Sequence, residues 1–492
     1  MRTALVLLFL LTLAALPGSL VPQRSVDPLR TQQFATDNPT LARWYERLSL
    51  FEVYSSPWFA AIYLLLFVSL VGCVLPRSLG HLSAVRARPP AAPRNLDRLP
   101  VHESWTTSAG RADVLSTARG VLRKARFRVD DGDGSVAAER GHWRETGNLV
   151  FHLSLLLLLV AVALGNLFGF KGSVLVVEGR AFSNTVTAYD TFTGGAAFDE
   201  GSLAPFTVAL DELAVRYQTS GDQRGAPRDF RAAVTYTPSP EAPEQRGVLR
   251  VNHPLTVDGT KVFLLGNGYA PVFTVRDATG AVVFSGPVPF LPRDGNMAST
   301  GVVKVPSAQP EQLGFEGLFL PTAVLDRQRG PVSAYPDTTL PRAVLTAFTG
   351  DLGVDDGSPQ SVYSLDKRGL TQVRGDGGQP LAQSLAPGTT MDLPDGASIT
   401  FDGVRRWASL QVARNPGTGP ALAASVLALA GLMLSLFVRR RRVWVRVGDA
   451  PGGRTLVEVA GLARSEGESR DALAEEVGAL AEQMGMEPRR GT

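Results

Sequence analysis

Four uninterrupted apolar segments constrain this 492-residue chain more than any other feature. They cover residues 4–21, 58–75, 149–168 and 420–438, and none contains Lys, Arg, Asp or Glu. A helix of about 17 to 25 apolar residues spans a bilayer, because its backbone polar groups bond within the segment. The first segment is the weakest, since its unbroken run over residues 4–16 also suits a signal peptide that is cleaved after residues 17–19. We therefore predict a polytopic α-helical membrane protein with about four transmembrane helices, of which the first is residues 1–21.

Basic residues beside these segments predict the topology, because short cytoplasmic loops carry an excess of Lys and Arg. Residues 76–148 contain 13 basic and 8 acidic side chains, and four arginines, Arg439 to Arg442, directly follow the fourth segment. Residues 76–148 and the tail 439–492 are therefore expected to be cytoplasmic. Residues 22–57 and 169–419 are expected to lie outside.

The cytoplasmic regions have recognisable local patterns. Residues 86–100 are rich in proline and predict an extended linker. Residues 111–125 have helical spacing and residues 127–138 predict a hairpin. This small α/β lobe is too small for a core of its own, so we expect it to pack against a partner or the membrane surface. The tail after Val447 has helical composition, with a periodic stretch over residues 472–484, and is expected to end in disorder.

Strand signals dominate residues 169–419 and predict a large β-rich extracytoplasmic domain with one or two sandwich-like or barrel-like lobes. Residues 256–265 and 272–284 each predict a hairpin. Short alternating strands are predicted at residues 173–177, 206–210 and 398–401. Gly266 to Pro271 resembles a dinucleotide loop only superficially, because no helix follows, and we expect a structural turn there.

Composition narrows the possible functions. The balance of 49 basic and 46 acidic side chains gives no basic field for nucleic acid. The single cysteine, Cys73, excludes an internal disulfide, a CxxC pair and a multi-cysteine metal site. We expect it to be a small buried hydrophobe. Walker, HExxH and GxSxG motifs are absent from the sequence, so any chemistry depends on histidine or on groups from another molecule.

His152 is the most informative residue, because it is the only histidine inside an apolar segment. It lies about one turn inside the cytoplasmic end of the third segment. Neutral imidazole is an axial ligand of haem iron, and an ionisable residue within a membrane helix indicates a functional site. The alternative is an interfacial histidine that points to water or bonds to a helix carbonyl.

The other histidines carry weaker signals. His253 is the only external histidine and could meet haem iron on that side, although the pattern favours a turn residue bonded locally beside Pro254. The remaining three lie in the basic cytoplasmic region and are expected to be solvated: His81, His102 and His142.

Five stretches together resemble the ResB proteins of System II cytochrome c biogenesis, in an actinobacterial version. They are Pro17 to Gln23, Val53 to Phe59 running on into residues 63–77, Gly147 to Ser154, Asn252 to Leu255, and Gly268 to Val275. The resemblance covers most of the chain. It implies three helices, a large external domain, and a fourth helix followed by a cytoplasmic tail, and it favours a retained first helix.

The resemblance also implies a function at the bacterial plasma membrane. ResB proteins act with a tryptophan-rich, ResC-like membrane subunit that moves haem b outward and presents it to apocytochrome c for thioether attachment. His152 matches the family histidine that ligates haem iron within the membrane. The chain would be a component of a haem–cytochrome c synthase complex, binding haem transiently and having no complete active site of its own.

The sequence itself indicates that a partner is needed. Its six tryptophans are scattered and form no cluster that could bind external haem. A single membrane histidine also leaves the second axial position of the iron to another chain. Two other functions remain possible: a membrane-anchored scaffold whose β domain binds a partner without a cofactor, and a dihaem quinol-oxidising subunit. The latter needs about two intramembrane histidine pairs and ranks last.

Overall fold

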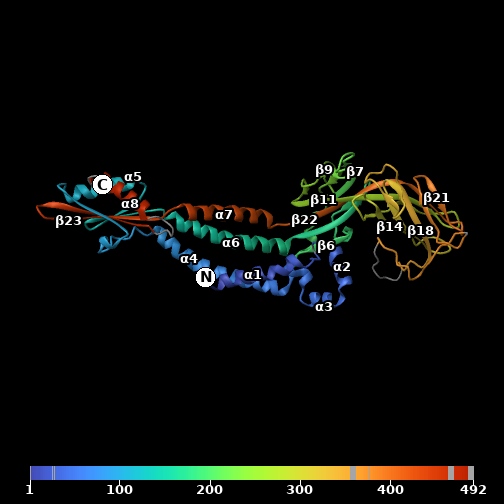
Figure 1. Cartoon of the computed structure of the whole chain (residues 1–492), viewed down its shortest axis with the longest axis horizontal. Coiled ribbons are helices and arrows are strands. Elements are labelled where there is room, and N and C mark those ends of the chain that lie inside the picture. Colours follow the sequence, from blue (N-terminus) through green and yellow to red (C-terminus); the bar gives the residue numbers. More distant parts are fainter. Residues whose placement is uncertain are drawn as a thin grey trace. The chain divides into compact units, whose positions relative to one another are not determined.

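The computed structural model describes residues 2–24, 26, 28–354, 362–375, 377–463 and 470–485. The chain forms two compact units. The first comprises Met1–Ala163 and Gly417–Thr492, and it contains the apolar helices and an α/β lobe (Figure 1). The second, Leu164–Pro416, is built almost entirely from strands.

Three helices in the described part of the chain are long and apolar enough to cross a membrane. They are the Pro57–Pro76 part of α4 (Pro57–Arg86), α6 (Trp143–Phe168) and α7 (Thr418–Phe437). The first predicted segment is also helical, as α1 (Arg2–Leu20), but its apolar part, Leu5–Leu20, is shorter. α6 begins six residues before the predicted segment, so His152 lies nine residues from its start instead of one turn. The helix extends into this polar stretch, where Glu145 forms an ion pair with Arg440.

α6 and α7 cross closely at two glycines. A Cβ on Gly147 would lie 2.7 Å from the carbonyl oxygen of Gly431, and one on Gly431 would lie 2.6 Å from the backbone nitrogen of Phe151. Both glycines are buried. Small residues let membrane helices approach to backbone contact, so this pair fixes the part of α6 next to His152.

The α/β lobe is a five-stranded sheet in the order β1-β24-β23-β3-β2. Its strands are β1 (Val101–Thr107), β2 (Arg128–Gly132), β3 (Ser135–Arg140), β23 (Arg441–Ala450) and β24 (Arg454–Ala463). The helices α5 (Arg111–Lys124) and α8 (Arg470–Gln483) share a hydrophobic core with it. The predicted helix and hairpin are confirmed as α5 and β2–β3. Their expected packing on a partner or the membrane is wrong, because residues 441–463 complete their core.

The helical interpretation of the tail directly after Val447 is also wrong. Val443, Val445 and Val447 are buried in β23, and Val457 and Val459 are buried in β24, which is the period-two alternation of strands. The periodic stretch over residues 472–484 is confirmed as helical as far as residue 483, in α8. The proline-rich linker is confirmed as largely irregular, with a short 3₁₀ turn, Leu96–Arg98. The indole N–H of Trp444 donates to the carbonyl of Pro90 at 2.8 Å.

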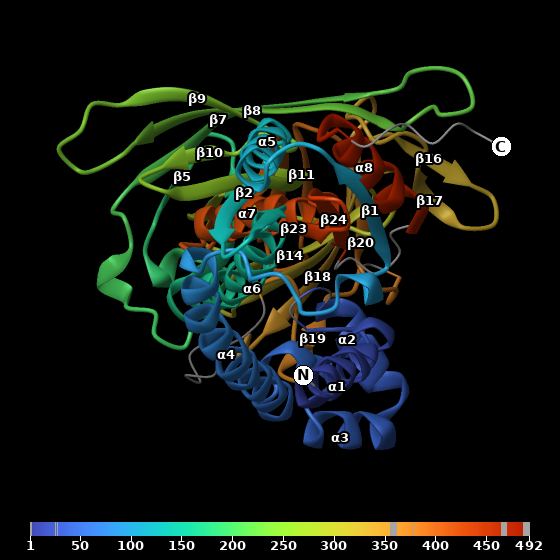
Figure 2. The same ribbon diagram turned by 90° about the vertical axis from the view of Figure 1, so that its left-hand side faces the viewer.

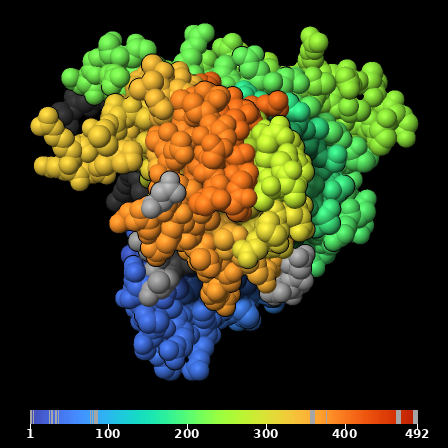
Figure 3. All heavy atoms as spheres, turned by 90° about the vertical axis from the view of Figure 1, so that its right-hand side faces the viewer, coloured from blue at the N-terminus to red at the C-terminus, as the bar shows by residue number. Residues whose placement is uncertain are grey.

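Three sheets and a hairpin make up the second unit. The seven-stranded sheet contains β4 (Phe170–Val177), β6 (Thr191–Gly194), β10 (Leu255–Val257), β11 (Thr260–Arg276), β12 (Val282–Pro287), β21 (Thr389–Asp392) and β22 (Ser398–Arg414). The four-stranded sheet contains β5 (Ala181–Ser183), β7 (Thr207–Tyr217), β8 (Pro227–Thr237) and β9 (Gln245–Arg250). The six-stranded sheet contains β13 (Leu291–Pro292), β14 (Ser299–Val305), β15 (Leu313–Leu320), β18 (Arg342–Gly350), β19 (Leu370–Gln372) and β20 (Ala382–Leu385). The hairpin of β16 (Ala323–Asp326) and β17 (Gly330–Ser333) projects from this unit (Figures 2 and 3).

The long strands β11 and β22 serve two hydrophobic cores. Each strand is 17 residues long, and β11 pairs with β22 from Lys261 to Arg276. Bulges interrupt the pairing after Leu264 and Val272 of β11. Cross-strand partners share a face of a sheet, and each bulge shifts the alternation by one residue. One face therefore buries Val262 and Leu264 against the four-stranded sheet, and the same face buries Phe273 against the six-stranded sheet. This confirms the predicted β-rich domain and its two hairpins, but Gly266 to Pro271 forms strand and not a turn.

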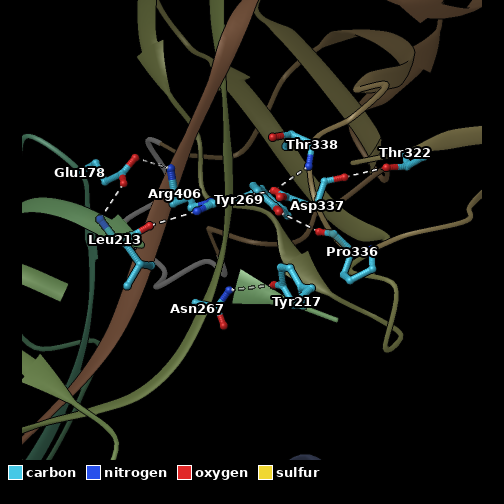
Figure 4. A network of polar contacts seen from close by, with 10 residues as sticks. All are labelled: Glu178, Leu213, Tyr217, Asn267, Tyr269, Thr322, Pro336, Asp337, Thr338 and Arg406. Carbon is cyan, nitrogen blue, oxygen red and sulfur yellow. Dashed lines mark hydrogen bonds and ion pairs between the residues drawn. The ribbon is translucent and has the colours of Figure 1, made fainter. Parts of the chain in front are cut away.

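A polar network lies on that face between the two cores (Figure 4). The Arg406 guanidinium donates to the carbonyl of Leu213 at 3.1 Å and to the carboxylate of Asp337 at 2.7 Å. Glu178 accepts the backbone N–H groups of Leu213 and Arg406, at 2.8 and 2.9 Å. The parts of the β-rich unit around the two hydrophobic cores are thus joined by hydrogen bonds and an ion pair as well as by shared strands.

In the α/β lobe, the buried carboxylate of Glu139 forms ion pairs with arginines that follow α7. The Glu139 side chain is 3% exposed and lies 2.5 Å from Arg440 and 3.3 Å from Arg442. Burial raises the pKa of Glu139, but hydrogen bonds and charge from Arg440 and Arg442 lower it more, so the net pKa lies below its ordinary value. The basic run that predicted the topology therefore also holds β23 to β3.

Replacing this carboxylate should destabilise the lobe. We expect Glu139→Gln to cost about 3–5 kcal/mol, as for other buried ion pairs that lose one partner. Because the folded pKa is depressed, the stabilisation is complete above the unfolded pKa of about 4.3 and is lost as the pH falls through the folded pKa. Thermal unfolding of the full chain in detergent between pH 7 and pH 3 measures both effects. Glu475→Gln, exposed on α8, is the matched control, and equal losses in the two variants would contradict the role of Glu139.

Candidate functional site

An apolar cavity of about 920 Å³ lies among α1, α4 and α6. α1 contributes Leu5, Leu8 and Leu11, whereas α4 contributes Leu66, Leu70, Cys73, Val74 and Gly80. α6 contributes one face of its helix: Glu145, Asn148, Leu149, Phe151, His152, Leu155, Leu158 and Leu159. The cavity combines a largely aliphatic wall with a few polar groups on α6, which is the usual composition of a small-molecule site.

The hydrogen bond of His152 determines its tautomer. Its Nδ1 lies 2.7 Å from the carbonyl oxygen of Asn148, one helical turn earlier. A carbonyl only accepts, so Nδ1 carries the proton and the neutral ring keeps its lone pair on Nε2. A carbonyl that accepts from the other ring nitrogen in this way orients histidines that bind metals. Half-buried at the cavity wall, His152 can therefore coordinate a transition-metal ion through Nε2.

Two further contacts hold the cavity walls in place. The hydroxyl of Tyr63 on α4 donates to the carbonyl of Leu159 on α6 at 2.7 Å. On the opposite side of α6, the Gly147–Gly431 crossing supports the backbone of Phe151, next to His152. The acceptor of the His152 hydrogen bond is a backbone carbonyl that any residue at position 148 provides, so no residue pattern in the sequence indicates this bond.

Cys73 departs from its expected role as a buried hydrophobe. It is exposed in the structure and belongs to the cavity wall on α4. Sequence reasoning missed it because the hydropathy of a segment does not show which neighbours cover each of its faces. The contribution of α1 to the cavity was missed for the same reason.

Several residues of the recognised motifs hold the loop between α1 and α4. Gln23 is buried, donates to the carbonyl of Leu50 at 2.9 Å and accepts the N–H of Val53 at 3.0 Å. The Ser56 hydroxyl accepts the N–H of Phe59 at 3.3 Å in the first turn of α4. These motif residues therefore fix the ends of two apolar helices and do not reach the cavity.

His253 lies in the other unit, so its position relative to His152 is not defined. It occupies the turn between β9 and β10, is exposed, and has Nδ1 3.1 Å from the carbonyl oxygen of Val251. In the described residues, no group of three or more His, Cys, Asp or Glu side chains forms a metal-binding cluster. His253 thus stands as a separate, solvent-facing candidate.

The three remaining histidines belong to the first unit. His102 is less solvated than expected: it lies in β1, with Nε2 3.4 Å from Glu458. His142 is half-buried beside the ring of Trp143. The side chain of His81 lies outside the described residues.

These features define a protein with apolar helices able to span a membrane, a β-rich unit and a histidine-bearing cavity among its helices. The model of the ResB-like family matches residues 1–474, and the chain belongs to this family. Two relatives named cytochrome c biogenesis protein CcsB come from Synechococcus sp. strains CC9311 and CC9605. They are 26% and 27% identical to this chain over 458 and 462 residues, which cover 92% and 91% of it and 88% of each relative.

A larger side chain at position 431 should disturb the backbone of α6 beside His152. We expect Gly431→Val to cost about 1–3 kcal/mol, the usual range for overpacking, because the added carbon atoms meet the backbone of Phe151. The thermal denaturation midpoint of the full chain in detergent should fall. Gly72→Val on α4 is the control, since a Cβ at Gly72 has nothing within 4 Å. Equal midpoints for the two variants would show that the crossing is not tight.

Proposed function

We propose that this chain is a haem-handling subunit of cytochrome c biogenesis in the bacterial plasma membrane. In this proposal His152 ligates haem iron inside the membrane, and the chain helps to move haem b outward and present it for attachment to apocytochrome c. The observation that carries the proposal is the Nδ1 contact with Asn148, which leaves Nε2 of a membrane-helix histidine available to a metal. Membership of the ResB-like family and the names of the relatives support the pathway.

The residues around His152 fit haem as a cargo. A volume of about 920 Å³ falls within the approximate range of 300–1,000 Å³ for small-molecule sites. Leucine side chains from α1, α4 and α6 provide an apolar surface for the macrocycle. Bound haem would supply its iron to the imidazole, and the bond to Asn148 would keep the ring in the coordinating tautomer.

The proposal requires a second membrane subunit. His152 supplies one axial ligand, and six-coordinate iron needs a second from elsewhere. We infer a tryptophan-rich, ResC-like partner, because the tryptophans of this chain are dispersed over both units and the helices. The basic residues of the α/β lobe favour a cytoplasmic lobe, and in this proposal the β-rich unit lies outside, where it would meet apocytochrome c.

We expect His152→Ala, in the complex with its partner, to abolish assembly of c-type cytochromes and to lower the haem that copurifies. Added imidazole should restore part of the haem absorbance, because it replaces the missing ligand. Ser154→Ala on the same helix is the matched control, since Ser154 donates to the carbonyl of Val150 and carries no ligand nitrogen. Normal haem content and assembly in the His152 variant would refute the ligand assignment.

The second candidate ligand has a separate test. His253→Ala should leave the haem that copurifies unchanged, because the His253 ring is exposed in a turn and bonds to its own backbone. A reduced haem content in this variant would instead make His253 a ligand on the outer side. A scaffold without a cofactor would form a stable complex with no haem absorbance in any preparation.

A further inference from the structure

The loop between α1 and α4 folds into a small helical cap. It consists of α2 (Pro28–Asp37), α3 (Pro39–Arg47) and a 3₁₀ segment, Leu50–Ser55. α1, α2 and α3 lie close together in Figure 2. Tyr45 of α3 stacks on Phe34 at 5.6 Å and packs edge-on against Phe51 at the same separation. The cap therefore has a core of its own, and α3 packs on it through one face.

α3 has three different faces. At about 100° per residue, Leu41, Trp44 and Leu48 fall within about 60° of one another. These three side chains are 43%, 57% and 55% exposed, and together they form the apolar stripe of α3. Ala42 and Tyr45 face the cap core, and the remaining side carries Arg43, Glu46 and Arg47.

The apolar stripe lies at the level where α4 begins. Trp58 is the second residue of α4, and its indole N–H donates to the carbonyl of Leu48 at 2.9 Å. The apolar span of α4 begins at Pro57, so the end of the stripe is fixed beside the end of that span. Tryptophan is enriched at this level in membrane proteins because its ring is apolar and its N–H is polar.

We propose that the apolar stripe of α3 inserts into the lipid surface at the Pro57 end of α4. A helix that divides into a protein-facing side, an apolar side with Trp and Leu, and a basic polar side has the pattern of an interfacial helix. The guanidinium of Arg47 lies 5.5 Å from the ring centre of Trp44, which lets the charge remain near the headgroups while the ring is buried. The partner is thus a phospholipid bilayer, and the inference does not depend on haem binding.

Lipid is favoured over a protein partner by the position of the charges. Arg47 flanks the stripe, and Arg43 lies on the polar side of the cap, where Arg24 pairs with Glu46 and Glu52. The headgroup region would solvate these charges while the stripe enters the apolar layer. The stripe also ends at Leu48, whose carbonyl accepts from Trp58 at the start of α4.

Spin labelling of the full chain tests the proposal. In a Cys73→Ala background, nitroxide labels are placed at Leu41→Cys and Leu48→Cys in the stripe and at Arg43→Cys on the polar side. The protein is reconstituted without a partner into phosphatidylcholine vesicles. Collision with oxygen, relative to an aqueous nickel chelate, should be several times greater at positions 41 and 48 than at 43.

Two outcomes would overturn the inference. Equal exposure of all three labels to the nickel chelate would place the stripe in water. Protection of positions 41 and 48 from both reagents would show that protein, such as a second copy of the chain, covers the stripe. The Arg43→Cys label serves as the internal control, because it lies on the same helix and reports misfolding of the cap.

Discussion

The close crossing of α6 and α7 is the constraint on which the architecture depends. α6 follows β3 and leads into β4, while β22 leads into α7 and α7 into β23. β3 pairs with β23, and β4 pairs with β22, so the two helices continue at both ends into paired antiparallel strands. Gly147 and Gly431 bring the helix backbones together, and this contact fixes the part of α6 next to His152.

The candidate site combines a chemically simple ligand with an environment that restricts it. The imidazole of His152 lies in a largely aliphatic cavity wall. The carbonyl of Asn148 accepts from its Nδ1 and so keeps the proton on that nitrogen. The cavity wall also carries the thiol of Cys73 and the carboxylate of Glu145. The function that we propose uses the imidazole to hold a metal-centred cargo, as one subunit of a larger assembly.

Local patterns in the sequence were sufficient for the helices and the β-rich unit, whereas the role of His152 stays a prediction. Hydropathy identified the apolar helices but placed the start of α6 too late, because Glu145 is satisfied by Arg440, a residue far away in the chain. The alternating valines of β23 and β24 were present, yet their partners lie in a separate segment of the chain. These two strands of the tail were therefore not predicted. Gly268 and Pro271 suggested a turn, but Gly268 is needed because a Cβ would lie 2.2 Å from the Trp407 ring. The cavity walls on α1 and α4 depend on packing that no single segment specifies.

The composition of the α/β lobe has a consequence for biosynthesis. β1, β2 and β3 are translated early, but the central strand β23 and its neighbour β24 emerge from the ribosome only after the entire β-rich unit and α7. Until then the edges of β1 and β3 lack their partners, so the nascent chain carries an unfinished sheet throughout most of its synthesis. Completion of this lobe therefore requires that α7 has already been made, and a chain truncated before Arg441 would present open strand edges to chaperones and proteases.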